Sequence, residues 1–459
     1  MASEPWQTGV MHTLEDLTRA LASGAVRARE LVDSALDRIA DPNGEGARAF
    51  MTVAAQSARA QADEIDRQRA AGATVPAFAG IPIAIKDLFD VAGEVTRAGS
   101  RILANEPPAL RDAPVIARLR GAGFIFIGRN TMTEFAFSGL GLNPHYGTPA
   151  SPFDRATGRI PGGSTSGGAV AVADGMAVAS LGTDTGGSCR IPAAFCGIVG
   201  FKPTAHRVPR DGATPLAHSL DSIGPLANSV SCCATLDSIL RGVTPRTPAS
   251  VSLSDVRLQL PTSLVLNDMD EHVTRAFERG VEDLARAGVS ISRRPLPELL
   301  RIPEINSRGG IATAEAYAWH RPLIEHHRDQ YDPRVASRII KGADLSYQDV
   351  RDMHDARAEV IANFERATSD VDALVLPTTP IIPPPFSAFE HDADYARLNV
   401  LVLRNPSVAN FLDGCAISLP VHRPGEPPVG LMLIGRRGSD DRLLAIAQAI
   451  EAALKQRRM

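Results

Sequence analysis

The residues of this chain that could do chemistry are a lysine and several hydroxyl residues, carried by three segments. The first segment, residues 80–86 (Gly-Ile-Pro-Ile-Ala-Ile-Lys), is an apolar run that ends at Lys86. Burial of such a strand end favours the uncharged amine, which can accept a proton. The same pattern also fits a lysine that snorkels from the strand end, or one that pairs with Asp87 or Asp90.

Lysine is rare in this chain. Of the 48 lysine and arginine residues only four are lysine, namely Lys86, Lys202, Lys341 and Lys455. A coding bias toward arginine explains the scarcity. Arginine keeps its proton in proteins, whereas a desolvated lysine can lose it. A lysine retained in an apolar run therefore indicates a role that needs a neutral amine.

The second segment, residues 161–168 (Pro-Gly-Gly-Ser-Thr-Ser-Gly-Gly), places Ser164, Thr165 and Ser166 among four glycines. Glycine permits backbone conformations that other residues avoid. The Gly-Lys-Ser/Thr ending of a phosphate-binding loop is absent. A flexible surface linker is one interpretation, but the segment runs directly into the apolar residues 169–173, which favours a fixed loop at the start of a helix.

The third segment, residues 181–192, predicts a strand, a glycine turn and a helix, with Ser188 in the turn. Main-chain N–H groups in such a turn can converge on one point, as an oxyanion hole requires. The start of a helix adds a dipole that favours negative charge. A plain strand-to-helix turn with Ser188 as its N-cap would show the same pattern.

Together these segments resemble the amidase signature family. Residues 182–188 (Gly-Thr-Asp-Thr-Gly-Gly-Ser) and 190–197 carry the closest likeness, and residues 200–204, 219–225 and 428–435 extend it over most of the chain. By this resemblance Ser188 is the nucleophile, Ser164 is the bridging serine after a cis peptide bond, and Lys86 is the base. The spacing of the two serines (188 − 164 = 24) agrees with the family. Ser166 remains a competing member of the hydrogen-bond network.

The resemblance implies a hydrolase of amide-type C–N bonds. Neutral Lys86 would take a proton through Ser164, Ser188 would attack the carbonyl carbon, and water would release the acyl-enzyme. No cofactor is expected for this chemistry. The eleven histidines form no metal-binding motif, and the pair His326 and His327 is expected on a solvated helix face.

The resemblance also assigns the surroundings of the nucleophile. The main-chain N–H groups of Thr185, Gly186 and Gly187, with that of Ser188 itself, would form the oxyanion hole. Asp184 and Arg190 flank this turn, and we expect them to hold its shape by charge pairing.

Three residues are predicted to bind substrate, namely Ser138, Gly139 and Arg207. Ser138 and Gly139 lie in residues 132–142, which include Phe135 and Phe137, while Arg207 follows Ala205 and His206. A structural salt bridge is an equally good role for Arg207. Residues 300–345 are a further candidate lining, although a core role is expected for their aromatic residues Tyr317 and Trp319.

The pattern of the segments that must position these residues predicts an α/β fold. Short apolar runs bounded by glycine and proline alternate with helical patterns from residue 79 onward, which is typical of a buried mixed sheet covered by helices on both faces. We expect one domain over residues 1–459. Its predicted parts are an N-terminal helical layer (1–75), a catalytic core (79–240), a variable helical portion (245–370) and a return to the sheet (371–459).

The overall composition of the chain limits where in the cell the protein is expected and what it is expected to bind. A net charge of −4 argues against nucleic acid or anionic lipid as a partner. Residues 1–11 lack a signal-peptide pattern, and no apolar run is long enough to span a bilayer. Five cysteines, odd in number and without a CxxC pair, indicate reduced, mostly buried thiols in a cytoplasmic protein. The expected partner is a small amide or carbamate substrate, and a homodimer is left open.

Three kinds of protein are compatible with these residues, namely two enzymes and one binding protein without activity. The first is a free-standing amidohydrolase for a small amide, with esters and carbamates (urethanes) open to the same attack. The second is the glutaminase subunit of a tRNA-dependent amidotransferase, which supplies ammonia to a partner. An inactive binding scaffold is disfavoured because Lys86, Ser164 and Ser188 are all present.

Overall fold

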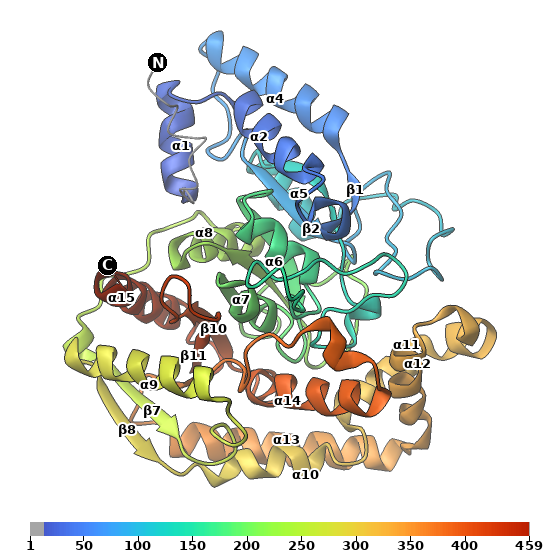
Figure 1. Cartoon of the computed structure of the whole chain (residues 1–459), viewed down its shortest axis with the longest axis vertical. Coiled ribbons are helices and arrows are strands. Elements are labelled where there is room, and N and C mark those ends of the chain that lie inside the picture. Colours follow the sequence, from blue (N-terminus) through green and yellow to red (C-terminus); the bar gives the residue numbers. More distant parts are fainter. Residues whose placement is uncertain (1–12, 459) are drawn as a thin grey trace.

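A computed structural model describes residues 13–458 of the chain. The first residues of the predicted helical layer (1–75), and the segment 1–11 that was compared with a signal peptide, lie outside the described residues. An eleven-stranded mixed sheet runs through the molecule in the order β1-β3-β2-β4-β6-β5-β10-β11-β9-β7-β8 (Figure 1). The strands are β1 (Phe50–Val53), β2 (Pro82–Lys86), β3 (Ile125–Asn130), β4 (Ala179–Asp184), β5 (Val199–Lys202), β6 (Ser222–Ala227), β7 (Arg257–Pro261), β8 (Ser290–Arg294), β9 (Ala373–Pro377), β10 (Cys415–Pro420) and β11 (Gly430–Gly435).

Helices cover the sheet in two layers. One layer contains α2, α3, α6, α7 and α14, and the other contains α5, α8, α15 and α9; within each layer every helix contacts the next in this order. The helices are α1 (Leu14–Ser23), α2 (Ala28–Ala40), α3 (Gly46–Ala49), α4 (Ala55–Ala70), α5 (Pro114–Gly121), α6 (Ser166–Ala173), α7 (Arg190–Cys196), α8 (Val230–Arg241), α9 (Glu271–Arg286), α10 (Arg301–Ile305), α11 (Gly310–His327), α12 (Pro333–Ile340), α13 (Tyr347–Ala367), α14 (Asp392–Phe411) and α15 (Asp440–Arg458). The predicted α/β fold with a mixed sheet flanked by helices is confirmed.

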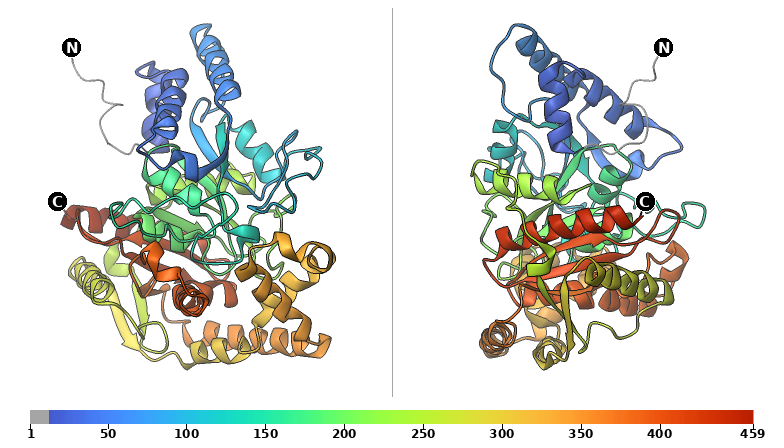
Figure 2. Two further views of the ribbon diagram at one scale, coloured as in Figure 1. Left: turned by 45° about the vertical axis from the view of Figure 1, so that its right-hand side comes forward. Right: turned by 90° about the vertical axis from the view of Figure 1, so that its left-hand side faces the viewer.

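The two ends of the molecule come from different parts of the chain. Helices α1, α2 and α4 gather at one end, and β7, β8 and α13 lie at the opposite end in all three views (Figures 1 and 2). Helix α1 begins as its sequence predicts, because the Thr13 hydroxyl accepts the N–H of Asp16 and the Asp16 carboxylate accepts the N–H of Thr13.

Two segments contain strands that periodicity did not predict. Residues 50–53 form the edge strand β1 between two N-terminal helices. The portion 245–370 is mostly helical, but it also adds β7 and β8 at the far edge of the sheet. Strand β8 is largely exposed, so its residues lack the apolar run that marks a buried strand.

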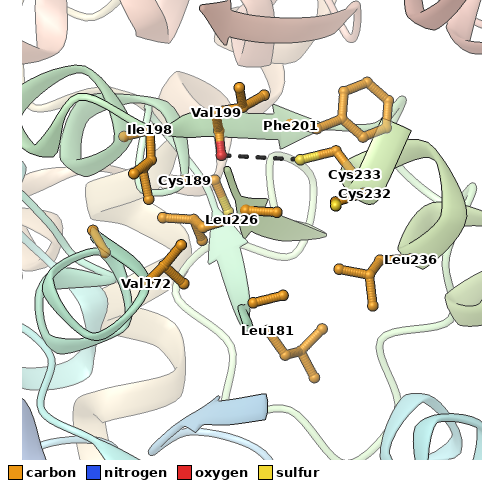
Figure 3. Close-up of a cluster of buried hydrophobic side chains, with 14 of the residues drawn as sticks. Val172, Leu181, Cys189, Ile198, Val199, Phe201, Leu226, Cys232, Cys233 and Leu236 are labelled. Atoms are coloured by element: carbon orange, nitrogen blue, oxygen red, sulfur yellow. Dashed lines mark hydrogen bonds between the residues drawn. The ribbon is translucent and has the colours of Figure 1, made fainter. Parts of the chain in front are cut away.

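An apolar cluster supports the nucleophile turn from below. Figure 3 shows Leu226 of β6 beside Cys189, with Leu181 of β4 and Phe201 of β5 in the same buried cluster. The Cys233 thiol donates to the Val199 carbonyl oxygen at 3.9 Å. All five cysteines are free and buried, as expected. Within residues 13–458, no helix has both the length and the apolar character needed to cross a membrane.

Candidate active site

Lys86 lies at the end of a central strand, where it has two hydroxyl partners. Strand β2 is buried along its whole length between β3 and β4. The Lys86 Nζ lies 2.7 Å from Ser164 Oγ and 2.8 Å from Thr183 Oγ1. Asp87 instead pairs with Arg129 at 3.3 Å, so the alternative of a structural Lys86–Asp87 ion pair does not hold.

The surroundings of Lys86 favour the neutral amine. Burial lowers its pKa from 10.5 to about 8, and the nearby Cys189, Asp184 and Asp221 only partly oppose this effect. Within the described part of the chain, Lys86 forms no ion pair with a carboxylate. A buried amine with hydroxyl neighbours can therefore exchange a proton near neutral pH.

Ser164 follows the cis peptide bond that the family resemblance implies, between Gly163 and Ser164. The Gly163 N–H donates to the Gly139 carbonyl oxygen at 2.9 Å, and the Ser164 carbonyl accepts the Thr133 N–H at 3.2 Å. A Cβ at position 163 would lie 2.7 Å from the Gly141 backbone, so only glycine fits there. These contacts fix the Ser164 hydroxyl beside Lys86.

Ser188 lies in a tight turn between β4 and α7. Gly187, just before it, has φ +133°, and a Cβ there would lie 2.6 Å from the Pro406 side chain. The Ser188 carbonyl accepts the Thr165 N–H at 3.3 Å, which ties the turn to the Ser164 loop. Among residues 13–458, no hydrogen bond joins the Ser164 and Ser188 hydroxyls directly, so that link of the relay stays a prediction.

A buried ion pair holds the turn, as expected from the sequence. Arg190 donates from Nη2 to Asp184 Oδ1 at 2.8 Å and from Nε to Asp184 Oδ2 at 3.1 Å, and both side chains are fully buried. Burial opposes ionisation of Asp184, but the charge and hydrogen bonds of Arg190 outweigh it and hold the pKa of this carboxyl below its ordinary value. Arg190 also donates to the Pro406 carbonyl (2.8 Å) and to Asn410 Oδ1 (2.7 Å) of α14.

The oxyanion-hole donors differ in their availability. The Gly187 N–H donates to Asp184 Oδ1 at 2.8 Å, so it is already engaged. In the described chain the N–H groups of Thr185, Gly186 and Ser188 have no partner, and all three residues line the cleft above the turn. The geometry thus favours these three N–H groups as donors to a substrate oxygen.

A cleft of about 630 Å³ opens at Ser188. Its apolar lining comes from several elements and includes Leu216, Leu220, Leu264, Ile302 and Leu403. Its polar lining includes Ser138, Arg338, Tyr395 and Asn399. A cavity of this size and mixed character suits a small organic molecule.

Of the residues predicted to bind substrate, only Ser138 lines the cleft. Its hydroxyl donates to Asn399 Oδ1 at 2.9 Å. The Gly139 N–H donates to the same oxygen at 2.9 Å, so Gly139 supports the lining from behind. Arg207 pairs with Asp237 at 2.9 Å and Asp440 at 3.5 Å and does not line the cleft, which matches its alternative structural role.

The segment 300–345 lines the cleft, while its aromatic residues Tyr317 and Trp319 do not. Ile302, Pro303 and Arg338 do so. Trp319 packs against Phe135 with ring centroids 6.0 Å apart, in keeping with the core role expected for it.

Sequence reasoning missed four polar residues of the site, namely Thr183, Arg338, Tyr395 and Asn399. Thr183 lies inside the glycine-rich motif and could have been singled out as a hydroxyl beside the base. The other three come from α12 and α14, whose sequences carry no motif, and Arg338 is one of 44 arginines (48 − 4).

Comparison with known proteins agrees with this geometry. A family model described as Amidase matches residues 30–444. The chain is 35% identical to 2-amino-5-chloromuconic acid deaminase of Comamonas testosteroni, over 89% of each chain. It is 34% identical to a glutamyl-tRNA(Gln) amidotransferase subunit of Symbiobacterium thermophilum, over 96% of each. A crystal structure of an amidase superposes with a TM-score of 0.87 at 32% identity, covering 96% of this chain and 99% of that one.

Proposed function

Because this chain belongs to the amidase signature family, we propose that it hydrolyses an amide-type C–N bond of a small molecule through an acyl-enzyme on Ser188. The chain is an amidohydrolase acting on C–N bonds other than peptide bonds, as its family and relatives are. The observation that carries the covalent mechanism is the 2.7 Å contact between the buried Lys86 Nζ and Ser164 Oγ, next to the Ser188 turn.

Acylation follows from this arrangement. The Ser188 proton passes to Ser164 while the Ser164 proton passes to neutral Lys86, and the Ser188 oxygen attacks the carbonyl carbon. The developing oxyanion accepts hydrogen bonds from the N–H groups of the turn, each typically worth about 3 kcal/mol. Lys86 then returns its proton through Ser164 to the leaving nitrogen, and the C–N bond breaks.

Thr183 has a positioning role in this relay. Its hydroxyl oxygen lies 2.8 Å from Lys86 Nζ and accepts one of the amine hydrogens. The single lone pair of the neutral amine can then accept the Ser164 hydroxyl proton across the 2.7 Å contact. Esters and carbamates present the same carbonyl carbon to Ser188 and are expected to react as well.

The cleft favours a substrate that carries a carboxylate. Arg338 lines it, with its guanidinium 4.3 Å from the Phe137 ring centroid, and it pairs with no acid in the described structure. Lys341 adds positive charge, while the lining residue Arg404 is paired with Asp268 at 3.3 Å. The one acidic lining residue of the described cleft, Asp392, is paired with Arg334 at 2.8 Å. The deaminase relative acts, by its name, on an acid.

The glutaminase subunit of an amidotransferase is the second candidate. The 34% identity to an amidotransferase subunit over 96% of both chains favours it, and glutamine also carries a carboxylate. The two functions differ in what the purified chain does by itself. A free-standing amidohydrolase releases an arylamine from a simple aryl amide without a partner, whereas the glutaminase prediction requires ammonia release from glutamine.

Labelling tests the covalent mechanism directly. A serine-reactive fluorophosphonate should modify the protein at Ser188, as located by peptide mass, and Ser188→Ala should lose both the label and turnover. Because serine and alanine differ little in volume, this variant should keep the wild-type unfolding curve. Labelling of another residue in the active wild type contradicts the assignment.

A further inference from the structure

A second cavity, of about 470 Å³, lies beside the proton relay, and its described lining does not include Lys86, Ser164 or Ser188. It is lined by Thr183, Asp221 and much of the loop 206–218. It shares Ala136, Thr185 and Leu216 with the cleft, but Ser188 lines only the cleft. The relay therefore lies between two cavities, with its nucleophile facing one and the Thr183 partner of its base facing the other.

The wall between the two cavities is organised by one carboxylate. The Thr185 hydroxyl donates to Asp221 Oδ1 at 2.5 Å. Asp221 Oδ2 accepts the N–H groups of Leu216 at 3.0 Å and Ala217 at 3.1 Å. Because Thr185 and Leu216 line both cavities, this wall is one residue thick.

The lining of the second cavity suits water. Besides Thr183 and Asp221 it includes Arg210, whose guanidinium lies 3.1 Å from His206 Nδ1 and 3.5 Å from His218 Nε2. A polar cavity with several donors and acceptors holds water readily, whereas an apolar one stays dry. The same cavity also has an apolar part, formed by residues such as Leu88, Val208 and Ile223, so its donors and acceptors gather on the side of Thr183, Asp221 and Arg210.

The acyl-enzyme creates a need for such a route. Once Ser188 is acylated, the acyl group occupies the cleft directly in front of it, and a second, polar cavity offers water an approach from another side. We propose that the second cavity holds the deacylating water, which reaches the acyl carbon past the shared wall residues Thr185 and Leu216. This inference rests on the proposed acyl-enzyme at Ser188.

In deacylation, water replaces Ser188 Oγ at the acyl carbon. The water oxygen forms a bond to the acyl carbon, and its proton passes through Ser164 to Lys86. The bond between the acyl carbon and Ser188 Oγ then breaks, and Lys86 returns the proton through Ser164 to Ser188 Oγ. The acid product leaves by the cleft.

The test separates acylation from deacylation with p-nitrophenyl butyrate as the probe. Release of nitrophenolate in a rapid first turnover measures acylation, and the later steady rate measures deacylation. Thr214 lines the second cavity and not the cleft, so Thr214→Phe fills the cavity and Thr214→Val is its size-matched control. Ala213→Phe, at the neighbouring lining position, is the second filling variant.

The expected result is a first turnover of unchanged rate followed by a steady rate about tenfold lower or more in the filling variants, with Thr214→Val unchanged. Val400→Phe, at an exposed cleft position, should do the reverse, slowing acylation alone. Equal effects on both phases, or no effect of filling, would overturn the proposed route. A wild type without a first-turnover burst, and with the fluorophosphonate label at a residue other than Ser188, would refute the acyl-enzyme itself.

Discussion

Lys86 is expected to set the pH range in which the enzyme works, because only its neutral form accepts a proton. With a pKa of about 8, about one tenth of the enzyme holds neutral Lys86 at pH 7 and about nine tenths at pH 9. The value of kcat/KM should therefore rise roughly tenfold over this range and level off above it. An amine at the ordinary value of 10.5 would instead be neutral in about one molecule in 3,000 at pH 7, and the rate would still climb at pH 10.

Lys86→Arg is the matching substitution. A guanidinium stays protonated, and its planar fork does not fit a fully buried strand end whose two partners are hydroxyls. We expect kcat/KM to fall by about a thousandfold or more. The assay is hydrolysis of an aryl amide between pH 6 and 10, with thermal unfolding of both proteins as the control. An active Lys86→Arg enzyme, or a wild-type rate that still climbs steeply at pH 10 without levelling off, would refute the role of Lys86 as the base.

The free energy of unfolding should also depend on the protonation of the buried Lys86 amine. The folded pKa of Lys86 lies below its unfolded value, so the native state binds fewer protons, and the free energy of unfolding should rise with pH between about 8 and 10.5. A Lys86 pKa that falls from 10.5 to about 8 on folding corresponds to roughly 3 kcal/mol in the free energy of unfolding. Urea unfolding at pH 7.5 and 10 should show the rise in the wild type and lose it in Lys86→Met.

Three further predictions concern the rest of the site. Ser164→Ala should lower kcat by about a hundredfold or more, but less than Ser188→Ala because a water molecule can partly bridge the gap; equal losses in the two variants would exclude such a bridge. Arg338→Leu should raise the KM of an amide that bears a carboxylate and leave that of its neutral methyl ester unchanged, and a parallel change in both would remove Arg338 from substrate binding. Asp184→Asn leaves the Arg190 charge buried without its partner and should cost about 3–5 kcal/mol in urea unfolding, so a loss below about 1 kcal/mol would contradict the structural role of this pair.

The parts of the site that could be predicted from sequence are those encoded by short, continuous segments. Lys86, Ser164 and Ser188 stand in glycine-rich or apolar runs whose local conformation follows from composition, and Asp184 and Arg190 are close enough in sequence to pair across one turn. The strands β7 and β8 and the cleft residues of α12 and α14 were not predictable in this way. Strand β7 joins the sheet through β9, more than a hundred residues later, β8 joins through β7, and the cleft residues of α12 and α14 meet the Ser188 turn from segments more than a hundred residues away.

The hydrogen-bond partners of individual donor groups could not be predicted from the sequence either. Gly187 was expected to donate to a substrate oxygen, yet its N–H donates to Asp184. Which N–H of a turn faces outward depends on φ and ψ at each residue, and composition does not specify these angles. Arg207 was assigned to the pocket as one alternative, but Asp237 and Asp440, far away in sequence, neutralise it.

The bonds of Arg190 to α14 bear on when the enzyme becomes active during its synthesis. Its guanidinium needs the Pro406 carbonyl and the Asn410 side chain, which leave the ribosome more than 200 residues after the nucleophile does. Until then Arg190 has Asp184 as a partner but lacks its two acceptors from α14, and the Ser188 turn cannot settle into its final conformation. A nascent chain that already contains Lys86, Ser164 and Ser188 is therefore expected to have no hydrolase activity, and its reactive serine forms only when nearly the whole polypeptide is available to fold.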